Sequence, residues 1–311
     1  AVYNIFLYGD MFRLLKRSRV SLVRPDFRLG LVNLSKSQVL VITALLAMAR
    51  TTGARIVLAP LAGASSLAAF ATMRTGANLA LQGLATITGP LMPELMRVLR
   101  ERDQARTEGA FALVWLVLVA IMAPAVVVLQ TIIEPLFVLW TRGQIEFQPI
   151  LFGVLSLSVL AFAWAQPAMA VVTGNNLLRP QLVVASVAAV VVVGGMMLLV
   201  PLMGILGAAV ALLLAELFAA YRFRIIADVW LEKHGLCWPR ASSRSAALSV
   251  WISAIAMTAI IHAPTYQIVF LGIGLTALAL NLFIYWRSLP LLIRERAKSR
   301  FARFYWKLIS I

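Results

Sequence analysis

Three arginines stand inside long apolar stretches of the sequence: Arg50, Arg55 and Arg74. A charge at the depth of a hydrocarbon layer is costly unless it meets a partner or a wet cavity, so such residues indicate a functional site. At about 1.5 Å per helical residue, Arg50 and Arg74 would lie about 17 Å and about 15 Å from the outer ends of two neighbouring antiparallel helices, and Arg55 about 9 Å. We therefore expect two guanidiniums to share one layer, with the third nearer the surface.

Two amides accompany the last of these cations. Asn78 and Gln82 follow Arg74 at intervals of four residues, which places the three side chains on one helix face. Guanidinium and amide groups suit an anion, phosphate in particular, so we expect the three arginines and two amides to line a substrate-binding cavity. In the alternative interpretation, Arg50 or Arg74 pairs with helix carbonyls or with Glu94 or Glu216 and only holds helices together.

Glu94 and Glu216 are the acids that belong to the apolar stretches. Both are predicted near the cytoplasmic ends of their helices, where a structural or snorkelling role is favoured. The second interpretation is that either carboxylate couples transport to an ion by carrying a proton.

Other chemistry has little support in the sequence. Cys237 is the only cysteine, and His234 and His262 are the only histidines, which leaves no intrachain disulfide and no zinc cluster of the usual kind. No acidic pair stands outside the membrane on the outer side, and His262 has no partner in the local sequence. We therefore predict no metal, no cofactor and no enzymatic activity.

The composition is that of an all-α integral membrane protein, with 62% hydrophobic and 13% charged residues and a mean hydropathy of +0.92. A spanning helix needs about 20 mainly apolar residues. Pro124 and Pro167 are expected to kink the third and fourth of the predicted helices. The sequence predicts about eight transmembrane helices, at residues 38–61, 64–95, 109–133, 147–173, 177–200, 204–226, 245–262 and 266–287.

Lys and Arg are distributed unevenly between the connections. Of the 28 in the chain, 24 fall before the first stretch, in alternate connections or in the tail, whereas the opposite connections hold only Arg142. This positive-inside asymmetry predicts that both ends of the chain are cytoplasmic. Because the cations separate apolar runs instead of forming one basic face, the formal net charge of +16 does not indicate a nucleic-acid partner.

The same patterns divide the chain into five regions. The first is predicted to be the end of a preceding helix and a basic linker lying on membrane lipid. Since the chain begins at Ala1 without a signal peptide, we expect it to be a fragment. The regions are the linker (1–37), a six-helix lobe (38–230), a cytoplasmic loop (231–244), two additional transmembrane helices (245–287) and a basic cytoplasmic tail (288–311).

Two blocks of sequence resemble lipid-linked oligosaccharide flippases. Residues 54–101, which begin ARIVLAPLAGASSLAAF, resemble the seventh and eighth helices of those proteins, with a small-residue hairpin leading to a long helix. Residues 173–223, which begin TGNNLLRP, are similar to the last helix pair of each lobe. This block has a Gly-Asn-Asn turn, a Leu/Val-Pro exit, a Gly-x-x-Gly-Ala-Ala re-entry and an acid, Glu216, near the helix end.

The resemblance implies the polysaccharide transporter branch of the multidrug/oligosaccharidyl-lipid/polysaccharide (MATE-like) superfamily. Its members translocate an undecaprenyl-pyrophosphate-linked O-antigen or exopolysaccharide repeat unit across the bacterial inner membrane by alternating access. The chain would be the C-terminal six-helix lobe plus two extra helices, and its partners would be the lipid-linked oligosaccharide, membrane lipids and the missing N-terminal lobe. Many relatives carry an Asp near the position of Arg55, so the arginine argues against cation coupling there.

Three other functions stay open. A multidrug or cation antiporter of the same fold would place carboxylates in the cavity, where the sequence predicts only cations. A membrane glycan polymerase or ligase would need a sizeable outer loop, and the predicted outer connections are short. A scaffold that binds the lipid-linked precursor without moving it would show no flux in liposomes.

Overall fold

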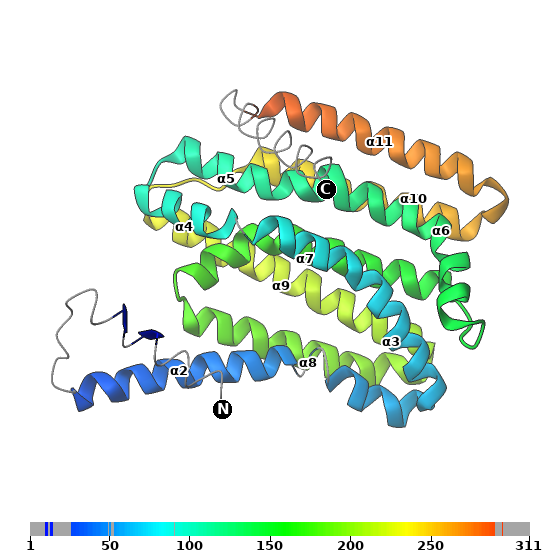
Figure 1. Ribbon diagram of the computed structural model, residues 1–311, viewed down its shortest axis with the longest axis horizontal. Helices are drawn as coiled ribbons and strands as arrows, with labels where there is room; N and C mark the ends of the chain where they lie inside the picture. The colour runs from blue at the N-terminus through cyan, green and yellow to red at the C-terminus, as the bar shows by residue number, and fades with distance from the viewer. Residues whose placement is uncertain are drawn as a thin grey trace. The chain divides into compact units, whose positions relative to one another are not determined.

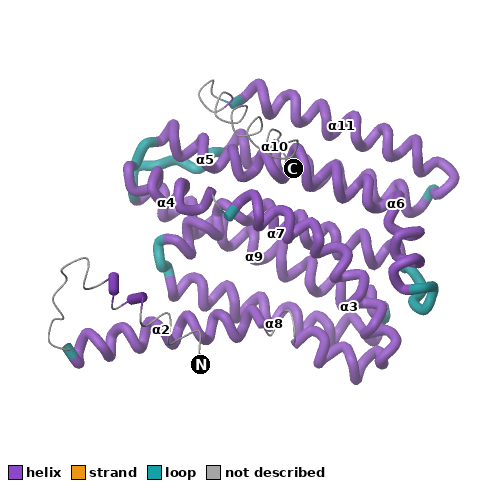
Figure 2. The backbone as a smooth tube through the Cα atoms, viewed as in Figure 1, coloured by secondary structure: helices purple, strands orange, loops and turns teal. Residues whose placement is uncertain are grey.

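The computed structural model is all-helical in the part of the chain that it describes, which comprises residues 10–11, 13–14, 26–48, 50, 53–89, 91–289 and 294. The side chains of Ala54, Arg55, Thr86 and Ile87 lie outside this description. Eight helices of the described part are long and apolar enough to cross a membrane, and no strand occurs among these residues (Figure 2). This is the architecture of an all-α, multi-pass membrane protein, as the composition predicts.

The chain divides by its internal contacts into two units, residues 1–41 and residues 42–311. In the first unit, α2 (Phe27–Met48) begins at Asp26, whose carboxylate accepts the backbone N–H groups of Arg28 and Leu29 at 2.9 and 3.2 Å. Such a cap satisfies N–H groups that have no partner within the helix. The predicted start of the first spanning helix, at residue 38, is therefore wrong, because the helix begins at this cap.

Gly63 falls in the connection between the first two predicted spans, and the structure has a kink there within one helix. Inside α3 (Ala54–Thr88), Gly63 has a φ of 82° and a ψ of 169°, a combination that glycine adopts far more readily than other residues. Residues 38–61, in contrast, do not form one regular helix. α2 ends at Met48, and the backbone of Arg50 has π-helical hydrogen bonding before α3 begins.

The second predicted span ends at Thr88 instead of residue 95. The sequence that follows forms a separate short helix, α4 (Leu91–Glu101). Pro93 lies in its first turn, where backbone N–H groups have no partner within the helix, so the N–H that proline lacks costs no helical hydrogen bond. α4 is amphipathic, and its buried side chains are Leu95, Val98 and Leu99. The charged end of the predicted span is therefore a surface helix at the end of the bundle.

The next span is built from three consecutive pieces. They are α5 (Gln104–Val117), the π-helical turn η2 (Leu118–Met122) and α6 (Ala123–Thr141). Pro124 has no N–H to donate to the preceding turn, and the widened π-helical turn lies directly before it. The irregularity predicted at Pro124 is confirmed, whereas α7 (Pro149–Gly174) continues as a helix through Pro167.

Small residues bring the helices that follow α7 close together. α8 (Leu178–Met203) and α9 (Ile205–Lys233) are joined at Gly204, whose φ of 60° and ψ of −145° reverse the chain. A Cβ atom added at Gly195 would lie 2.9 Å from the Cβ of Ala211, so the two helices touch where both side chains are minimal. The predicted Gly-x-x-Gly re-entry is thus the point at which α8 passes into α9.

The last two spans pack on α5 and α6. They are α10 (Arg240–His262) and α11 (Gln267–Ser288), joined by the short helix η3 (Pro264–Tyr266). A Cβ atom added at Gly274 of α11 would lie 2.8 Å from the Cβ of Ala256 of α10. The pair therefore approaches at small residues, as α8 and α9 do.

Hydrogen bonds also hold α10 and α11. The Asn281 amide donates to the backbone oxygen of Ser245 at 2.9 Å and to the Ser249 hydroxyl at 2.7 Å. The Tyr285 hydroxyl donates to the backbone oxygen of Ala112 on α5 at 2.6 Å. We refer to Ser245, Ser249, Asn281 and Tyr285 as the polar seam. Each of its interactions is neutral and lies inside the bundle.

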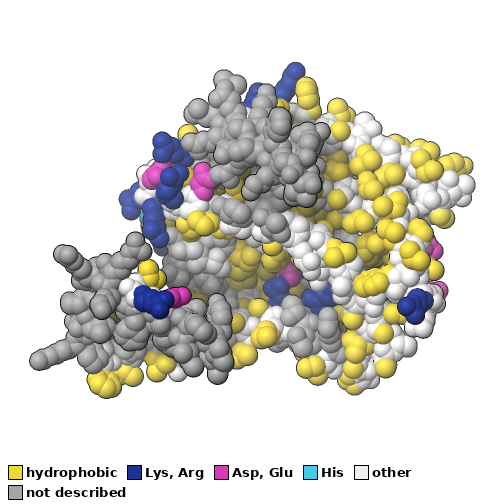
Figure 3. Space-filling model, viewed as in Figure 1, with side chains coloured by type: hydrophobic (Ala, Val, Ile, Leu, Met, Phe, Trp, Pro, Cys, Tyr) yellow, Lys and Arg dark blue, Asp and Glu magenta, His cyan; other side chains and the backbone are white. Residues whose placement is uncertain are grey.

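The connections of the second unit alternate between its two ends (Figure 1). The α4–α5, α7–α8 and α9–α10 connections share one end with the C-terminal end of α11, and the α6–α7, α8–α9 and α10–α11 connections share the other. On the face drawn in Figure 3, charged side chains gather over α4 and α5, and hydrophobic ones cover much of the opposite, right-hand side. The basic residues of the first end include Arg100, Arg106, Arg179, Lys233 and Arg240, whereas Arg142 lies at the second.

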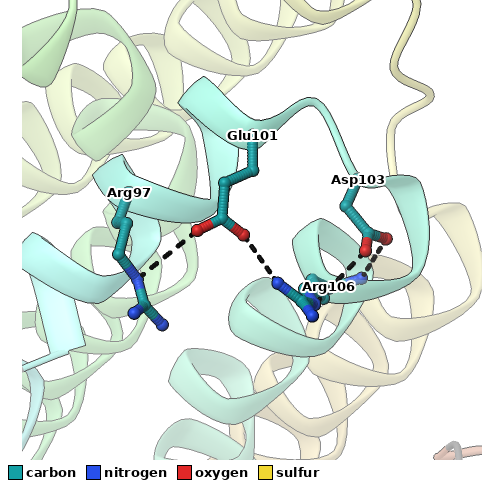
Figure 4. A network of polar contacts seen from close by, with 4 residues as sticks. All are labelled: Arg97, Glu101, Asp103 and Arg106. Carbon is teal, nitrogen blue, oxygen red and sulfur yellow. Dashed lines mark hydrogen bonds and ion pairs between the residues drawn. The ribbon is translucent and has the colours of Figure 1, made fainter.

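A network of four charged side chains links α4 to α5 (Figure 4). Arg106 donates to Glu101 at 2.7 Å and pairs with Asp103 at 3.3 Å, and Arg97 lies 3.8 Å from Glu101. These side chains are between 37% and 65% exposed, so solvent screens their interactions. Asp103 also accepts the backbone N–H of Arg106 at 3.1 Å, which caps α5.

Candidate functional site

The candidate site lies in the second unit, where four segments converge. Arg50 comes from the π-helical backbone after α2, and Arg74 and Asn78 come from one face of α3. Glu216 comes from α9, and α7 supplies four of the ten lining residues. The four-residue spacing on α3 turns Arg74 and Asn78 in the same direction, as the sequence predicts.

Arg50 and Glu216 form an ion pair across the site. Nη2 of Arg50 donates a hydrogen bond to Oε1 of Glu216. The Arg50 side chain is 20% exposed and the Glu216 side chain 15%, so the pair is largely withdrawn from solvent. A charge in such a position needs its partner, because an uncompensated one would bear the full penalty of desolvation.

Arg74 is the second cation of the site. Its guanidinium carbon lies 6.0 Å from the centroid of the Phe70 ring, one helical turn earlier on α3. The Phe70 side chain is fully buried, so its ring is a fixed surface for the guanidinium. Arg74 lines the same cavity as Arg50 and Glu216. Two cations therefore share the cavity with one carboxylate.

These groups line a cavity of about 200 Å³. Its described polar lining consists of Arg50, Arg74, Asn78, Ser158 and Glu216, whose formal charges sum to one positive unit. The remaining lining residues are apolar, which lowers the local dielectric constant and strengthens the field of the charges. They are Leu81, Leu155, Val159, Phe162 and Leu212.

No protein-family model, curated protein or solved structure matches the chain. The site is therefore interpreted from its geometry. Two guanidiniums and an amide can bind a phosphate or another oxyanion through several hydrogen bonds at once.

The structure brings three of the five predicted cavity residues together: Arg50, Arg74 and Asn78 line the cavity. Gln82 has an exposed side chain and does not line it. The side chain of Arg55 lies outside the described residues, although its backbone belongs to α3.

The two predicted acids separate. Glu94 is half-buried in the first turn of α4, away from the cavity lining. Glu216 lies in the cavity, and its predicted place near the cytoplasmic end of a helix is wrong, because α9 continues to Lys233. At about 1.5 Å per residue, Glu216 is about 17 Å from the start of α9, close to the depth predicted for Arg50. The cavity is therefore not lined by cations alone, and the Arg50–Glu216 pair is one that the alternative interpretation of the arginines predicted.

Six lining residues were not predicted from the sequence, and Ser158 and Phe162 of α7 are the polar and the aromatic ones among them. Their spacing of four residues places them on one helix face. Neither residue is unusual in an apolar helix, so only the charges on the neighbouring helices identify that face. The Ser158 hydroxyl donates to the backbone oxygen of Leu155 at 2.6 Å. Its oxygen can still accept hydrogen bonds through its lone pairs.

The described residues contain no group of three or more His, Cys, Asp or Glu side chains placed to hold a metal ion. The polar part of the cavity is made of guanidinium, amide, hydroxyl and a single carboxylate. Such a donor set favours an oxyanion over a metal cation.

Proposed function

We propose that the chain is part of a transporter that moves an anionic, phosphorylated lipid carrying a saccharide across a membrane. The observation that carries the proposal is the cavity, in which Arg50, Arg74 and Asn78 meet inside a bundle of membrane-length helices. Among the described lining residues, two guanidiniums and one carboxylate give an excess of one positive charge, which attracts an anion.

The size of the cavity supports a headgroup as the bound part. Drug-sized ligands occupy sites of about 300 to 1,000 Å³, so a cavity of about 200 Å³ suits a phosphate or diphosphate group and not a whole oligosaccharide. In this proposal Arg74 and Arg50 bind the diphosphate, Asn78 contacts the first sugar, and the prenyl chain stays in lipid. The exposed Gln82 is left out of this arrangement.

The resemblance to the polysaccharide transporter branch extends the proposal to the fold. Residues 38–230 would form the C-terminal six-helix lobe and residues 245–287 the two additional helices. The glycine turn between α8 and α9 supports this assignment, since the same motif contributes to the resemblance. A second, N-terminal lobe would complete the transport path, and rocking of the lobes would give alternating access.

We further propose that the basic end of the bundle faces the cytoplasm of a bacterial inner membrane. The support is the grouping of basic connections at one end. Cys237, an exposed cysteine of the α9–α10 connection, should be protected from a membrane-impermeant maleimide in intact cells. In a Cys237→Ser background, Arg142→Cys should be labelled. The reverse pattern would overturn the orientation.

The function is tested by complementation in cells whose surface glycan depends on this protein. Arg74→Glu should abolish surface glycan, and Arg74→Gln should reduce it at least about tenfold, the factor for about 1.4 kcal/mol of lost binding. Arg142→Gln removes the same charge at an exposed position outside the cavity and is the matched control. Normal glycan with either Arg74 variant, at normal expression, would contradict the proposed cavity.

Glu216 favours a second candidate, a cation-coupled exporter of the same fold. A carboxylate in the cavity is what a cation antiporter uses to attract its substrate, and here one is present. Efflux of a cationic dye would then depend on Glu216 and not on Arg74. If Glu216→Gln abolishes dye efflux and Arg74→Gln does not, this second function replaces the first.

A further inference from the structure

The cavity contains its own anion. Glu216 occupies Arg50, and it is the only carboxylate among the lining residues. An anionic headgroup that needs both guanidiniums must therefore displace the Glu216 carboxylate from Arg50. This inference rests on the proposed function, because it concerns the same anion cavity.

We propose that Glu216 is an internal competitor that sets the selectivity of the cavity, which excludes small monoanions and admits diphosphates. The carboxylate is tethered to α9, so its effective concentration at Arg50 is high and independent of the surrounding solution. An acetate-like monoanion offers Arg50 only what Glu216 already provides. It therefore gains nothing by displacing the tethered group.

A diphosphate differs because it can contact Arg50 and Arg74 together. Both arginines line the same small cavity as the Glu216 carboxylate. A second guanidinium contact and a second negative charge offset the loss of the internal pair. Rejection of weaker ligands by a built-in rival is a general route to specificity.

Among the described lining residues, only the three charged groups take part in this competition. α7 contributes Leu155, Ser158, Val159 and Phe162 to the lining, which carry no charge, and α9 adds Leu212 beside Glu216. α3 contributes Arg74, Asn78 and Leu81. Among the described lining residues the charge balance is therefore set by two arginines and Glu216.

The test measures binding of inorganic pyrophosphate and of acetate to the full 311-residue chain in lipid nanodiscs, by isothermal titration calorimetry. If Glu216 leaves about one tenth of the molecules competent to bind, Glu216→Gln should tighten pyrophosphate binding about tenfold. Acetate binding should become measurable in this variant alone, so that the preference for pyrophosphate falls. The exposed Glu146, in the α6–α7 connection, supplies the matched control Glu146→Gln, which should change neither affinity.

Weaker or unchanged pyrophosphate binding by Glu216→Gln, with binding by the wild type intact, would overturn this inference alone. Glu216 would then be a positioning group for Arg50. Absence of pyrophosphate binding in both the wild type and Glu216→Gln would contradict the proposed anion cavity itself. Should Glu216→Gln fail to elute as a folded protein, Glu216→Asp gives the same test, since its carboxylate is one methylene further from Arg50 and should also tighten pyrophosphate binding.

Discussion

The bundle contains two polar regions of opposite character, the charged cavity and the polar seam. In the seam, Asn281 is 4% exposed and Tyr285 fully buried, and each side chain donates to a neutral acceptor on a neighbouring helix. In the cavity, the ion pair is 15 to 20% exposed and lines the same space as a second cation, Arg74. Neutral donors that find buried acceptors join helices. Charges that retain space around them can exchange partners.

The difference teaches how a membrane-embedded polar group can be classified. Hydrogen bonds between helices in a membrane contribute about 0.6 kcal/mol on average, enough to fix a helix pair without any need for charge. A buried ion pair is a less favourable way to join two helices, because the desolvation penalty of its charges can exceed their Coulomb attraction. We therefore expect variants of the seam to change stability but not pyrophosphate binding, and variants of the cavity to change pyrophosphate binding whether or not they change stability.

The largest effect on stability should come from Tyr285→Ala in the seam. The change removes a fully buried ring and the hydrogen bond to the backbone oxygen of Ala112. Truncation of a buried aromatic side chain costs about 3 to 5 kcal/mol because the surroundings relax only partly. Equilibrium unfolding of the purified protein measures the loss. The folded fraction should bind pyrophosphate as the wild type does. A weakened affinity would contradict the distinction between the polar seam and the cavity.

The next effect concerns the ion pair. Glu216→Gln leaves Arg50 and Arg74 as neighbouring cations in the cavity, so we expect it to destabilise the protein by about 2 kcal/mol, below the full range for a completely buried pair. The double variant Arg50→Gln, Glu216→Gln replaces the pair by two amides and should recover most of that loss. Unfolding in the presence of pyrophosphate should restabilise Glu216→Gln and leave the double variant nearly unchanged. An additive double variant would contradict the pairing.

The sequence predicts one of these regions better than the other. Arg50, Arg74 and Asn78 are identifiable because a charge in an apolar stretch is rare and a four-residue period fixes a face. Asn281 and Ser249 carry no such signal, since small polar residues are ordinary in membrane helices. The fold follows the same rule. Hydropathy predicts eight spans, which the structure contains.

The ends of helices and the partners of their side chains depend on local caps and tertiary contacts that the sequence does not show. The start of α2 is determined by the Asp26 cap, and α9 continues beyond its predicted end at residue 226 to Lys233. Glu216 lies mid-helix in α9 and lines the cavity, where it pairs with Arg50. Which of the possible partners Arg50 takes depends on how α9 packs, and the sequence alone left that choice open.

Two asparagines allow the closest comparison of the regions. Asn281→Leu leaves the Ser249 hydroxyl without its 2.7 Å partner and should reduce stability by about 1 kcal/mol, with pyrophosphate affinity unchanged. Asn78→Leu makes a change of the same size in the half-buried lining of the cavity and should weaken affinity with little change in stability. Isothermal titration calorimetry of both variants measures the pyrophosphate affinity, and equilibrium unfolding measures the stability. Equal effects of the two changes on both quantities would remove the distinction.

The smallest effect on stability should come from the exposed network at the α4–α5 turn. A variant there tests whether charge alone, without burial, distinguishes the cavity. Glu101→Gln removes an acid that contacts Arg106 at 2.7 Å, yet both side chains are more than one third exposed. Water solvates the released guanidinium, and Asp103 still pairs with it at 3.3 Å, so the loss should be about 0.5 kcal/mol or less. The same deletion of an acid at Glu216 should cost several times more, because there the released cation faces apolar walls and a second cation. If unfolding gives equal losses at the two positions, burial is not what gives the cavity its character, and the charges of Arg50 and Arg74 would need another explanation.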